Sequence, residues 1–162
     1  MENRTKFTET LPIAIKKMHL WRREIDVRPA SFAEALQPLA DANIRLRAFM
    51  RYKHFRDGKR AVLEVCPHES EDENRCASIM HAAGFKVSNV PVLLIEGDEA
   101  PGVEYAIAKL VAEQDLDMVF CVTQNVNGKW GALMGFVSEA DAEKAALALL
   151  LLKIEILERE QS

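Results

Sequence analysis

The residues best suited to binding chemistry lie in one short segment, Asp98 to Gly102. Gly102 has no Cβ atom, so a ligand could approach the backbone closely there. The N–H groups that begin the helix expected next have no partners within it, and the positive end of its dipole lies beside them, so they could hold a carboxylate. Asp98 or Glu99 could accept hydrogen bonds from an ammonium group. A plain turn with Pro101 at the first helical position explains the same residues equally well.

The cysteine and histidine residues form no recognisable metal motif. Cys66, His68, Cys76 and His81 do not have the spacing of a paired zinc motif, and the sequence contains no Cys-x-x-Cys. Cys121 stands among apolar residues of an expected strand, which is typical of a small buried hydrophobe. Three cysteines without close pairing favour reduced thiols in a cytoplasmic protein over a disulfide framework. We therefore expect no metal and no cofactor.

Signatures of catalysis are also missing from the sequence. It contains no phosphate-binding P-loop, no dinucleotide fingerprint and no Gly-x-Ser-x-Gly motif. The acidic residues between Glu69 and Glu73 are expected to begin a helix, where the helix dipole favours negative charge. We expect no catalytic residue and a protein that is not an enzyme.

A basic stretch supports an alternative function. Cations alternate with aromatic residues along an expected strand, as in sheets that stack the bases of single-stranded RNA or DNA. The aromatic strand signature of RNA-recognition folds is absent and the net charge of the chain is −4, so we rank nucleic-acid binding below metabolite binding. Protection of a sheet edge, or docking onto the acidic half of another subunit, would use the same residues. They are Arg45, Arg47, Phe49, Arg51, Lys53, Phe55 and Arg56.

Composition and charge set the broad class. Hydrophobic residues make up 49% of the chain and charged residues 28%, a globular balance. The longest apolar run, Ala145 to Leu152, is far shorter than the roughly 20 residues of a membrane-spanning helix, and the N-terminus lacks the apolar core of a signal peptide. Residues 1–60 carry a net charge of +7 and the remainder −11, an asymmetry that can favour docking between two chains. We expect a cytoplasmic protein without a membrane partner.

Two repeats are expected to position the candidate residues. Helical patterns begin at Pro29 and at Pro101, each after a strand-like segment and each followed by a second strand, a tight turn and a returning strand. The turns contain Asp57-Gly58 and Asn127-Gly128, both typical of hairpins. Capping boxes, Ser70 with Glu73 and Ser138 with Asp141, then indicate a second helix in each repeat. This order is that of the split βαβ, ferredoxin-like unit.

The sequence therefore predicts an α+β protein with two tandem βαββαβ units, each an antiparallel sheet with helices on one face. We expect an N-terminal extension at residues 1–18, the first unit at 19–88 and the second at 89–162. Residues after Ala148 could form a strand from Lys153 to Leu157, but a long C-terminal helix to about Glu158 is favoured because no glycine ends the helical segment there.

Several of these residues resemble the ACT domain family. Asp98-Glu-Ala-Pro101-Gly102 is similar to the family's Asp-x-Pro-Gly loop, and Leu110 to Asp117 is similar to the stretch that leads into its second strand. Leu39 to Ile44 follows the same pattern, and Gly84 to Glu96 resembles the junction of free-standing tandem ACT proteins. The resemblance covers residues 19–150. The first loop departs from the family pattern, since Arg28 and Ala30 replace an acidic or amide residue and a glycine.

The resemblance implies a non-catalytic regulatory module that binds an amino acid or similar metabolite where ACT units meet. From the apolar C-terminal segment and the charge asymmetry we expect a homodimer, and the protein is expected to act through its own assembly or on a separate regulated protein. The alternatives are a single-stranded nucleic-acid-binding protein and a purely structural dimerisation module. The implied ligand-binding residues come from both units: Asp98, Glu99, Ala100, Pro101, Gly102, Leu116, Asp117, Arg28, Pro29, Ala30, Ile44 and Arg45.

Overall fold

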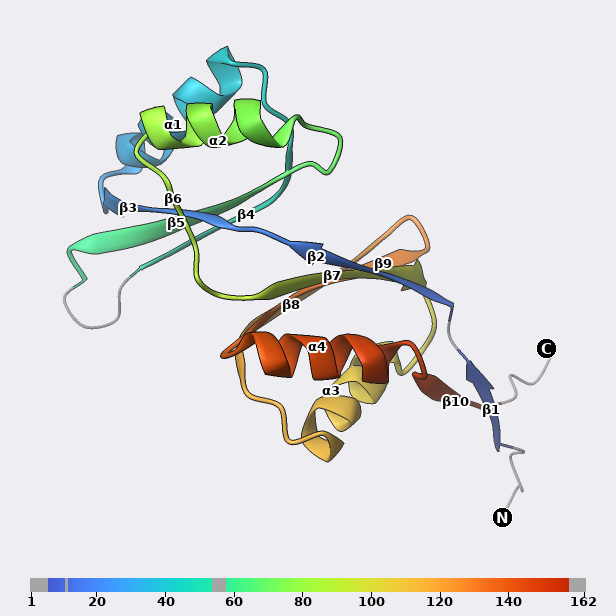
Figure 1. Ribbon diagram of the computed structural model, residues 1–162. Helices are drawn as coiled ribbons and strands as arrows, with labels where there is room; N and C mark the ends of the chain where they lie inside the picture. The colour runs from blue at the N-terminus through green and yellow to red at the C-terminus, as the bar shows by residue number, and fades with distance from the viewer. Residues whose placement is uncertain (1–5, 11, 54–57, 158–162) are drawn as a thin grey trace. The chain divides into compact units, whose positions relative to one another are not determined.

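The computed structural model describes residues 6–10, 12–53 and 58–157 (Figure 1). Two compact units form within the chain. One, which we call the inserted unit, consists of residues 19–89. The other, the composite unit, combines residues 1–18 with residues 90–162. The units therefore do not follow one another simply along the chain, because the inserted unit interrupts the composite one.

The inserted unit has a four-stranded antiparallel sheet with two helices on one face (Figure 1). The sheet order is β4-β5-β3-β6, so β4 and β6 are its edges. In chain order its elements are β3 (Trp21–Asp26), α1 (Pro29–Asp41), β4 (Leu46–Lys53), β5 (Arg60–Pro67), α2 (Glu73–Ala82) and β6 (Lys86–Val87).

The composite unit has the same architecture, but its edge strand comes from the N-terminal segment. The sheet order is β2-β7-β9-β8, with β2 antiparallel to β7 along the whole of β2. Strand β2 thus occupies beside β7 the position that β6 occupies beside β3, although β2 precedes the inserted unit in sequence and β7 follows it. The elements are β2 (Ile13–Met18), β7 (Val92–Asp98), α3 (Val103–Glu113), β8 (Met118–Val126), β9 (Lys129–Phe136) and α4 (Glu139–Leu149).

The N-terminal residues accordingly have a place that the sequence analysis did not find. Ile13 lies opposite Gly97 and Met18 opposite Val92, so residues 13–18 belong to a sheet rather than to an extension. Their burial alternates only weakly and two lysines stand among them, Lys16 and Lys17, which is why the pattern resembled a polar lead. Backbone hydrogen bonding to β7, and not side-chain hydrophobicity, fixes this strand.

Each unit has its own apolar core beneath its helices. In the composite unit the largest fully buried members include Ile95, Met134, Phe136 and Leu149. In the inserted unit they include Leu39, Leu63, Met80 and Phe85. The helical spacing of α1 and α3 places Leu39 and Leu110 inward, as the repeats predicted.

Turns and caps confirm much of the repeat pattern and correct one part of it. Asn127 and Gly128 have φ angles of 52° and 75°, as a tight hairpin turn requires. Ser138 caps α4 by accepting a hydrogen bond from the backbone N–H of Asp141 at 3.1 Å. The prediction of a capping box at Ser70 and Glu73 is wrong. Asp72 caps α2, and its side chain accepts a hydrogen bond from the backbone N–H of Arg75 at 2.7 Å. Residues 54–57, which include Phe55, Arg56 and Asp57, lie outside the described residues.

The prediction of a long C-terminal helix is also wrong. Helix α4 ends at Leu149, and β10 (Lys153–Leu157) follows and pairs with β1 (Lys6–Thr10) as a separate two-stranded antiparallel sheet. The N–H groups of Leu151 and Leu152 turn back to the carbonyls of Ala148 and Leu149, which tightens and closes the last turn. The Lys-Ile-Glu-Ile-Leu segment alternates with period two and supplies β-branched residues, a pattern that favours a strand once a partner is available.

A matched pair of glycine substitutions tests the packing of β9. A Cβ atom at Gly135 would lie 2.7 Å from Cζ of Phe120 and closer still to the ring's Cε1, whereas one at Gly131 would meet only the Ile95 carbonyl oxygen at 3.7 Å. We expect Gly135→Ala to lower the free energy of unfolding by roughly 1–3 kcal/mol, as overpacking does, and Gly131→Ala to leave it nearly unchanged. Urea denaturation measures both. Equal effects would show that Phe120 does not restrict this position.

Candidate functional site

The loop between β7 and α3 contains the residues that the sequence placed first. Gly102 is the residue before α3 and has a φ of 88°, a conformation that side chains disfavour. A Cβ atom there would meet nothing within 4 Å, so glycine is needed for backbone conformation and not because another atom approaches. No side chain caps the helix, so its first N–H groups are not taken up by a side-chain acceptor.

Contacts hold this loop to the neighbouring hairpin. Asp98 forms an ion pair with Lys129, its partner across the β7–β9 ladder. The N–H of Glu99 donates to the carbonyl of Gly128 at 2.9 Å. Glu99 and Pro101 are exposed and Ala100 is half-buried. The loop is thus an ordered surface with a carboxylate that already has a cationic partner.

The structure does not bring all the expected residues of the composite unit together. Leu116 and Asp117 follow the far end of α3, and eleven helical residues span about 16 Å. Leu116 packs against the core, and the Asp117 carbonyl accepts a hydrogen bond from the N–H of Val137. Within their own unit, these two residues and the Asp98–Gly102 loop lie at opposite ends of α3.

The corresponding loop of the inserted unit opens onto a cavity of about 390 Å³. Arg28 precedes α1, Pro29 is its first residue, and both are exposed along with Ala30. The sequence analysis singled out Arg28 among the residues around this space. The cavity lining is Arg23, Glu24, Ile25, Asp26, Arg28, Ser31, Glu34 and Arg60.

Ion pairs join several residues of the cavity lining. The Arg28 guanidinium lies 3.3 Å from Glu34 Oε2 and 3.8 Å from Asp26 Oδ2. Arg60 Nη1 donates to Glu24 Oε2 at 3.0 Å. Arg23 donates instead to the backbone carbonyl of Ala83 at 2.8 Å, which ties the strand to the end of α2. The lining therefore combines three guanidinium groups with three carboxylates.

One polar group in the lining lacks a partner. Ser31 is 6% exposed, and its Oγ atom has no hydrogen-bond partner among the described residues. A buried hydroxyl without a partner is costly, so such groups are uncommon. Ser31 lies in the first turn of α1 and is not among the residues expected from the sequence. A serine at this position of the sequence gives no signal that its side chain is buried.

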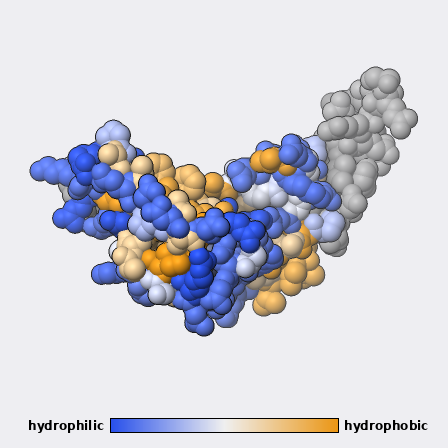
Figure 2. Space-filling view, turned by 90° about the horizontal axis from the view of Figure 1, so that it is seen from above, coloured by the Kyte–Doolittle hydropathy of each residue, from blue (hydrophilic) through white to orange (hydrophobic). Residues whose placement is uncertain are grey.

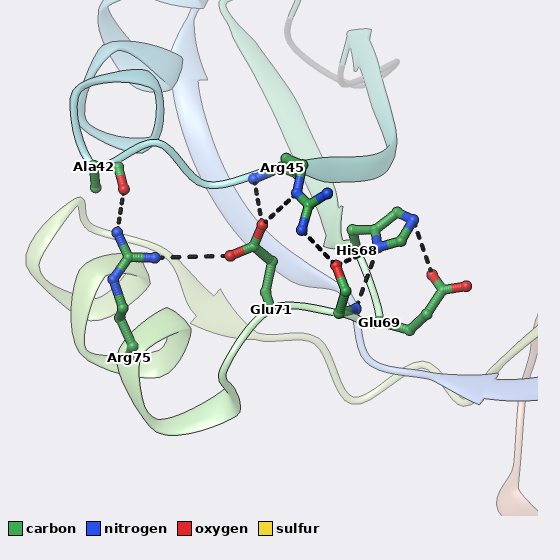
Figure 3. Close-up of polar contacts among 7 residues, drawn as sticks. Ala42, Arg45, His68, Glu69, Glu71 and Arg75 are labelled. Carbon is green, nitrogen blue, oxygen red and sulfur yellow. Dashed lines mark hydrogen bonds and ion pairs between the residues drawn. The ribbon is translucent and has the colours of Figure 1, made fainter.

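Ile44 and Arg45, the remaining expected site residues, have structural contacts. Ile44 is buried in the core of the inserted unit. Arg45 binds Glu71 twice: its backbone N–H donates to Glu71 Oε1 at 3.0 Å and its Nε at 3.1 Å (Figure 3). Thirteen residues of α1, about 20 Å of helix, separate them from Arg28.

Further contacts extend from this pair into a network (Figure 3). Arg45 Nη2 donates to Ser70 Oγ at 2.8 Å, and Ser70 Oγ lies 2.8 Å from His68 Nδ1. Arg75 forms an ion pair with Glu71 at 3.7 Å and donates to the carbonyl of Ala42. The network joins the end of α1, the start of β4 and the loop before α2, so it explains why Ser70 is not a helix cap.

The basic strand is arranged differently from a base-stacking surface. Phe49 of β4 packs against Phe32 of α1, with ring centroids 5.7 Å apart. Phe49 is one of the two aromatic residues of the nucleic-acid interpretation, and it remains 54% exposed beside this contact. On the other face, Tyr52 donates to the buried Glu64 at 3.2 Å.

The thiols and the remaining titratable groups show no clustered centre in the part of the chain that the structure describes. There, no three His, Cys, Asp or Glu side chains form a group that could hold a metal. Burial raises the pKa of the Cys66 thiol to about 11, which keeps it protonated at neutral pH. Cys76 is buried too, while Cys121 is exposed, contrary to the expectation for a small buried hydrophobe. No helix among the described residues is long and apolar enough to cross a membrane.

Comparison with known proteins identifies the fold. No protein-family model and no curated protein matches the sequence. Among solved structures, a Bacteroides thetaiotaomicron protein superposes with a TM-score of 0.69 at 11% identity, covering 87% of this chain and 94% of the other. The regulatory subunit of aspartate kinase from Thermus flavus has a TM-score of 0.56 at 13% identity, covering 87% and 97%. The regulatory subunit of aspartate kinase from Thermus thermophilus has a TM-score of 0.54 at 13% identity, covering 86% of this chain and 99% of the other.

These similarities agree with the sequence resemblance. The chain shares its fold with solved regulatory subunits of aspartate kinase, which agrees with an ACT-like, ferredoxin-like fold. At such low identity the match concerns the fold and transfers no ligand.

The Arg45–Glu71 contacts predict a pH-dependent stability. Hydrogen bonds from the Arg45 backbone and side chain lower the pKa of Glu71 below its ordinary value of 4.5. A lowered pKa in the folded state stabilises the protein above the ordinary value, and this stabilisation is lost as the pH falls through the folded-state pKa. We expect Glu71→Gln to lower the melting temperature at pH 7 and the difference from wild type to vanish in acid.

The control for this measurement is Glu113→Gln, which removes only an exposed ion pair with Lys109 at 3.7 Å. Exposed pairs of this kind contribute about 0.2–1 kcal/mol. A Glu71→Gln effect that does not decrease toward acid pH would contradict the assignment.

Proposed function

We propose that this protein is a non-catalytic regulatory module that binds an amino acid or a similar small zwitterion in the cavity of the inserted unit. The observation that carries the proposal is the cavity itself, about 390 Å³ at the end of β3 beside the first turn of α1. Its size is within the range of small-molecule sites, which are roughly 300–1,000 Å³.

The position of the cavity along β3 supports access to the backbone. Strand β6 lies opposite Trp21 and Arg22 only, whereas β2 covers β7 from Val92 to Gly97. The cavity is lined by the four consecutive residues that follow Arg22 in β3. Because consecutive side chains point to opposite faces of a sheet, a space that touches all four must lie along the strand edge. A ligand there could add to the sheet edge where the fourth strand stops.

The charges of the lining support a zwitterion. Three guanidinium groups and three carboxylates balance, so a ligand that is neutral overall but carries both charges meets partners for each. Arg28 is the expected carboxylate partner, because its two ion pairs are exposed and long and can exchange at little cost. Ser31 could donate its unsatisfied hydroxyl, and the positive end of the α1 dipole lies nearby. Glu34 or Asp26 would then accept from the ammonium group.

Regulation requires that the ligand distinguish two states of the protein, since equal affinity for both shifts no equilibrium. We propose that the states differ in the assembly of this cytoplasmic protein, as a homodimer, or in its contact with a separate regulated protein. The fold supports this proposal, because the chain aligns with nearly the whole of the Thermus regulatory subunits. The Asp98–Gly102 loop is the corresponding position in the composite unit and is proposed as a second, weaker site.

A thermal-shift panel of the twenty amino acids tests the function. A ligand of the folded state stabilises it by about 2.7 kcal/mol at a hundredfold excess over Kd. We expect one polar member of the panel to raise the melting temperature, and Arg28→Gln to abolish that shift. No shift with any amino acid would count against the proposal.

A matched variant distinguishes the two loops. Lys129→Gln removes a cation from the hairpin beside the Asp98–Gly102 loop and leaves the inserted unit unchanged. We expect the Lys129→Gln protein to keep the ligand-induced shift. If this variant loses it and Arg28→Gln keeps it, the ligand binds in the composite unit instead.

A further inference from the structure

One ion pair in the lining of the cavity presents a donor and an acceptor side by side. Arg60 Nη1 donates to Glu24 Oε2 at 3.0 Å, and the two side chains are 63% and 47% exposed. Hydrophilic residues cover much of the face that Figure 2 draws, so charge alone distinguishes no site. This pair is distinguished because both of its members line the cavity of the inserted unit.

The pairing of β3 with β5 fixes where this ion pair lies. Asp26 is the register partner of Arg60. Arg60 therefore reaches Glu24, two positions earlier in β3, diagonally across the two strands. Glu24 and Asp26 point to the same face of the sheet, and their backbone positions are about 6.6 Å apart. That face is opposite the helices, because Ile25, which lies between them, packs in the core.

Arg28 marks the other end of the site. It lies 3.8 Å from Asp26 Oδ2 and 3.3 Å from Glu34 Oε2, and it is the proposed partner of the ligand carboxylate. When Arg28 binds that carboxylate, Asp26 can accept hydrogen bonds from the ammonium group of the same ligand. The cavity continues along β3 from Asp26 to Glu24, since both residues line it. The side chain of the ligand therefore has space in the direction of Glu24.

The spacing along β3 selects the length of that side chain. Positions two residues apart in a strand are about 6.6 Å apart. In an extended glutamine the carboxamide nitrogen lies about 6 Å from the ammonium nitrogen, and in asparagine about 5 Å. The hydroxyl groups of serine and threonine lie within about 4 Å of the ammonium nitrogen, which is too short. A ligand that spans both carboxylates has the length of glutamine.

The chemistry of the ion pair selects the end group. A carboxamide has a carbonyl oxygen that accepts hydrogen bonds and an NH₂ group that donates them. It can therefore bind Arg60 and Glu24 together, and the ion pair need not break, because a guanidinium has five N–H donors and a carboxylate accepts several bonds. A ligand carboxylate would be repelled by Glu24 and a ligand ammonium by Arg60.

We propose that the cavity of the inserted unit selects glutamine and binds its carboxamide between Arg60 and Glu24. This inference rests on the proposed function and names the ligand within it. Arg28 and Asp26 bind the carboxylate and ammonium groups that all amino acids share. Arg60 and Glu24 bind the group in which glutamine differs from the others. Substitutions can therefore change the choice of ligand without removing the binding of amino acids.

Four ligands of related shape test the selection. Glutamate has the shape of glutamine with a charged end, methionine has a similar length with an apolar end, and asparagine is one methylene shorter. We expect titration calorimetry with the whole protein to give a Kd for glutamine roughly tenfold below the Kd of each of the other three, because only glutamine satisfies both members of the ion pair.

Two variants should change this preference in different directions. Glu24→Gln leaves Arg60 without its carboxylate partner, so we expect glutamate to bind this protein more tightly than glutamine. Arg60→Gln leaves the Glu24 carboxylate without its guanidinium, so we expect lysine to gain affinity and glutamine to lose it. Glu113→Gln makes the same change at an exposed ion pair outside the cavity and should keep the wild-type preference. Thermal melts without ligand establish that each variant is folded.

The outcomes separate this inference from the proposed function. If another amino acid binds as tightly as glutamine and Arg28→Gln abolishes that binding, the site exists and its selection of glutamine is wrong. If glutamine binds best and neither Glu24→Gln nor Arg60→Gln alters the preference, the carboxamide does not lie between these residues. If the wild-type protein binds no amino acid, the proposed function and this inference are both excluded.

Discussion

The need to hydrogen-bond the edge of the first strand governs the organisation of this protein. In each unit the strand before the first helix, β3 or β7, is central: it pairs with β5 or β9 on one side and requires a further strand on the other. Buried backbone N–H and C=O groups need hydrogen-bond partners, because a buried group without one costs free energy comparable to a lost hydrogen bond. Beside β7 the partner is β2, which begins at Ile13 and precedes the whole inserted unit in sequence. The interruption of one unit by the other follows from this solution.

The same requirement is met less completely in the inserted unit, and the candidate site lies where it fails. Strand β6 has two residues and ends opposite Arg22. Past that point the cavity takes the place of a strand, and charged side chains border it. A full-length β6 would fill this space with protein, as β2 does in the composite unit. The short strand therefore leaves the edge of β3 uncovered at this point, and Arg28 and Ser31 lie beside the cavity at the start of the helix that follows β3.

The two units differ in the charge of their side chains at positions that the fold makes equivalent. Each has a loop before its first helix, and the loop of the composite unit holds its carboxylate against Lys129, while that of the inserted unit holds Arg28 between two carboxylates. Each also has a second strand at a sheet edge, one cationic and one neutral. The two units therefore share a fold but differ in charge at equivalent positions.

The sequence by itself determined the local structure of this protein. Hairpin turns at Asn127-Gly128, the Ser138 cap and the inward spacing of Leu39 and Leu110 depend on residues near in sequence, so their patterns sufficed. Only tertiary structure decided the rest. Residues 13–18 became a strand because β7 required a partner, and the C-terminal segment became β10 because β1 was available to pair with it. Partnership between distant segments leaves little trace in side-chain composition, because the backbone makes the bonds.

Part of the candidate site could likewise be predicted from the sequence, and part depended on the tertiary structure. Loop residues at the start of each helix could be named from their types, and Arg28 among them borders the cavity. Glu34, Arg60 and the unpaired hydroxyl of Ser31 could not, since what distinguishes them is where β6 stops and how deeply α1 buries its first turn. Ile44 and Arg45 were named from the motif, yet one packs in the core and the other binds Glu71. Sequence specified which residues could bind a charged molecule, and the fold decided which of them have space to do so.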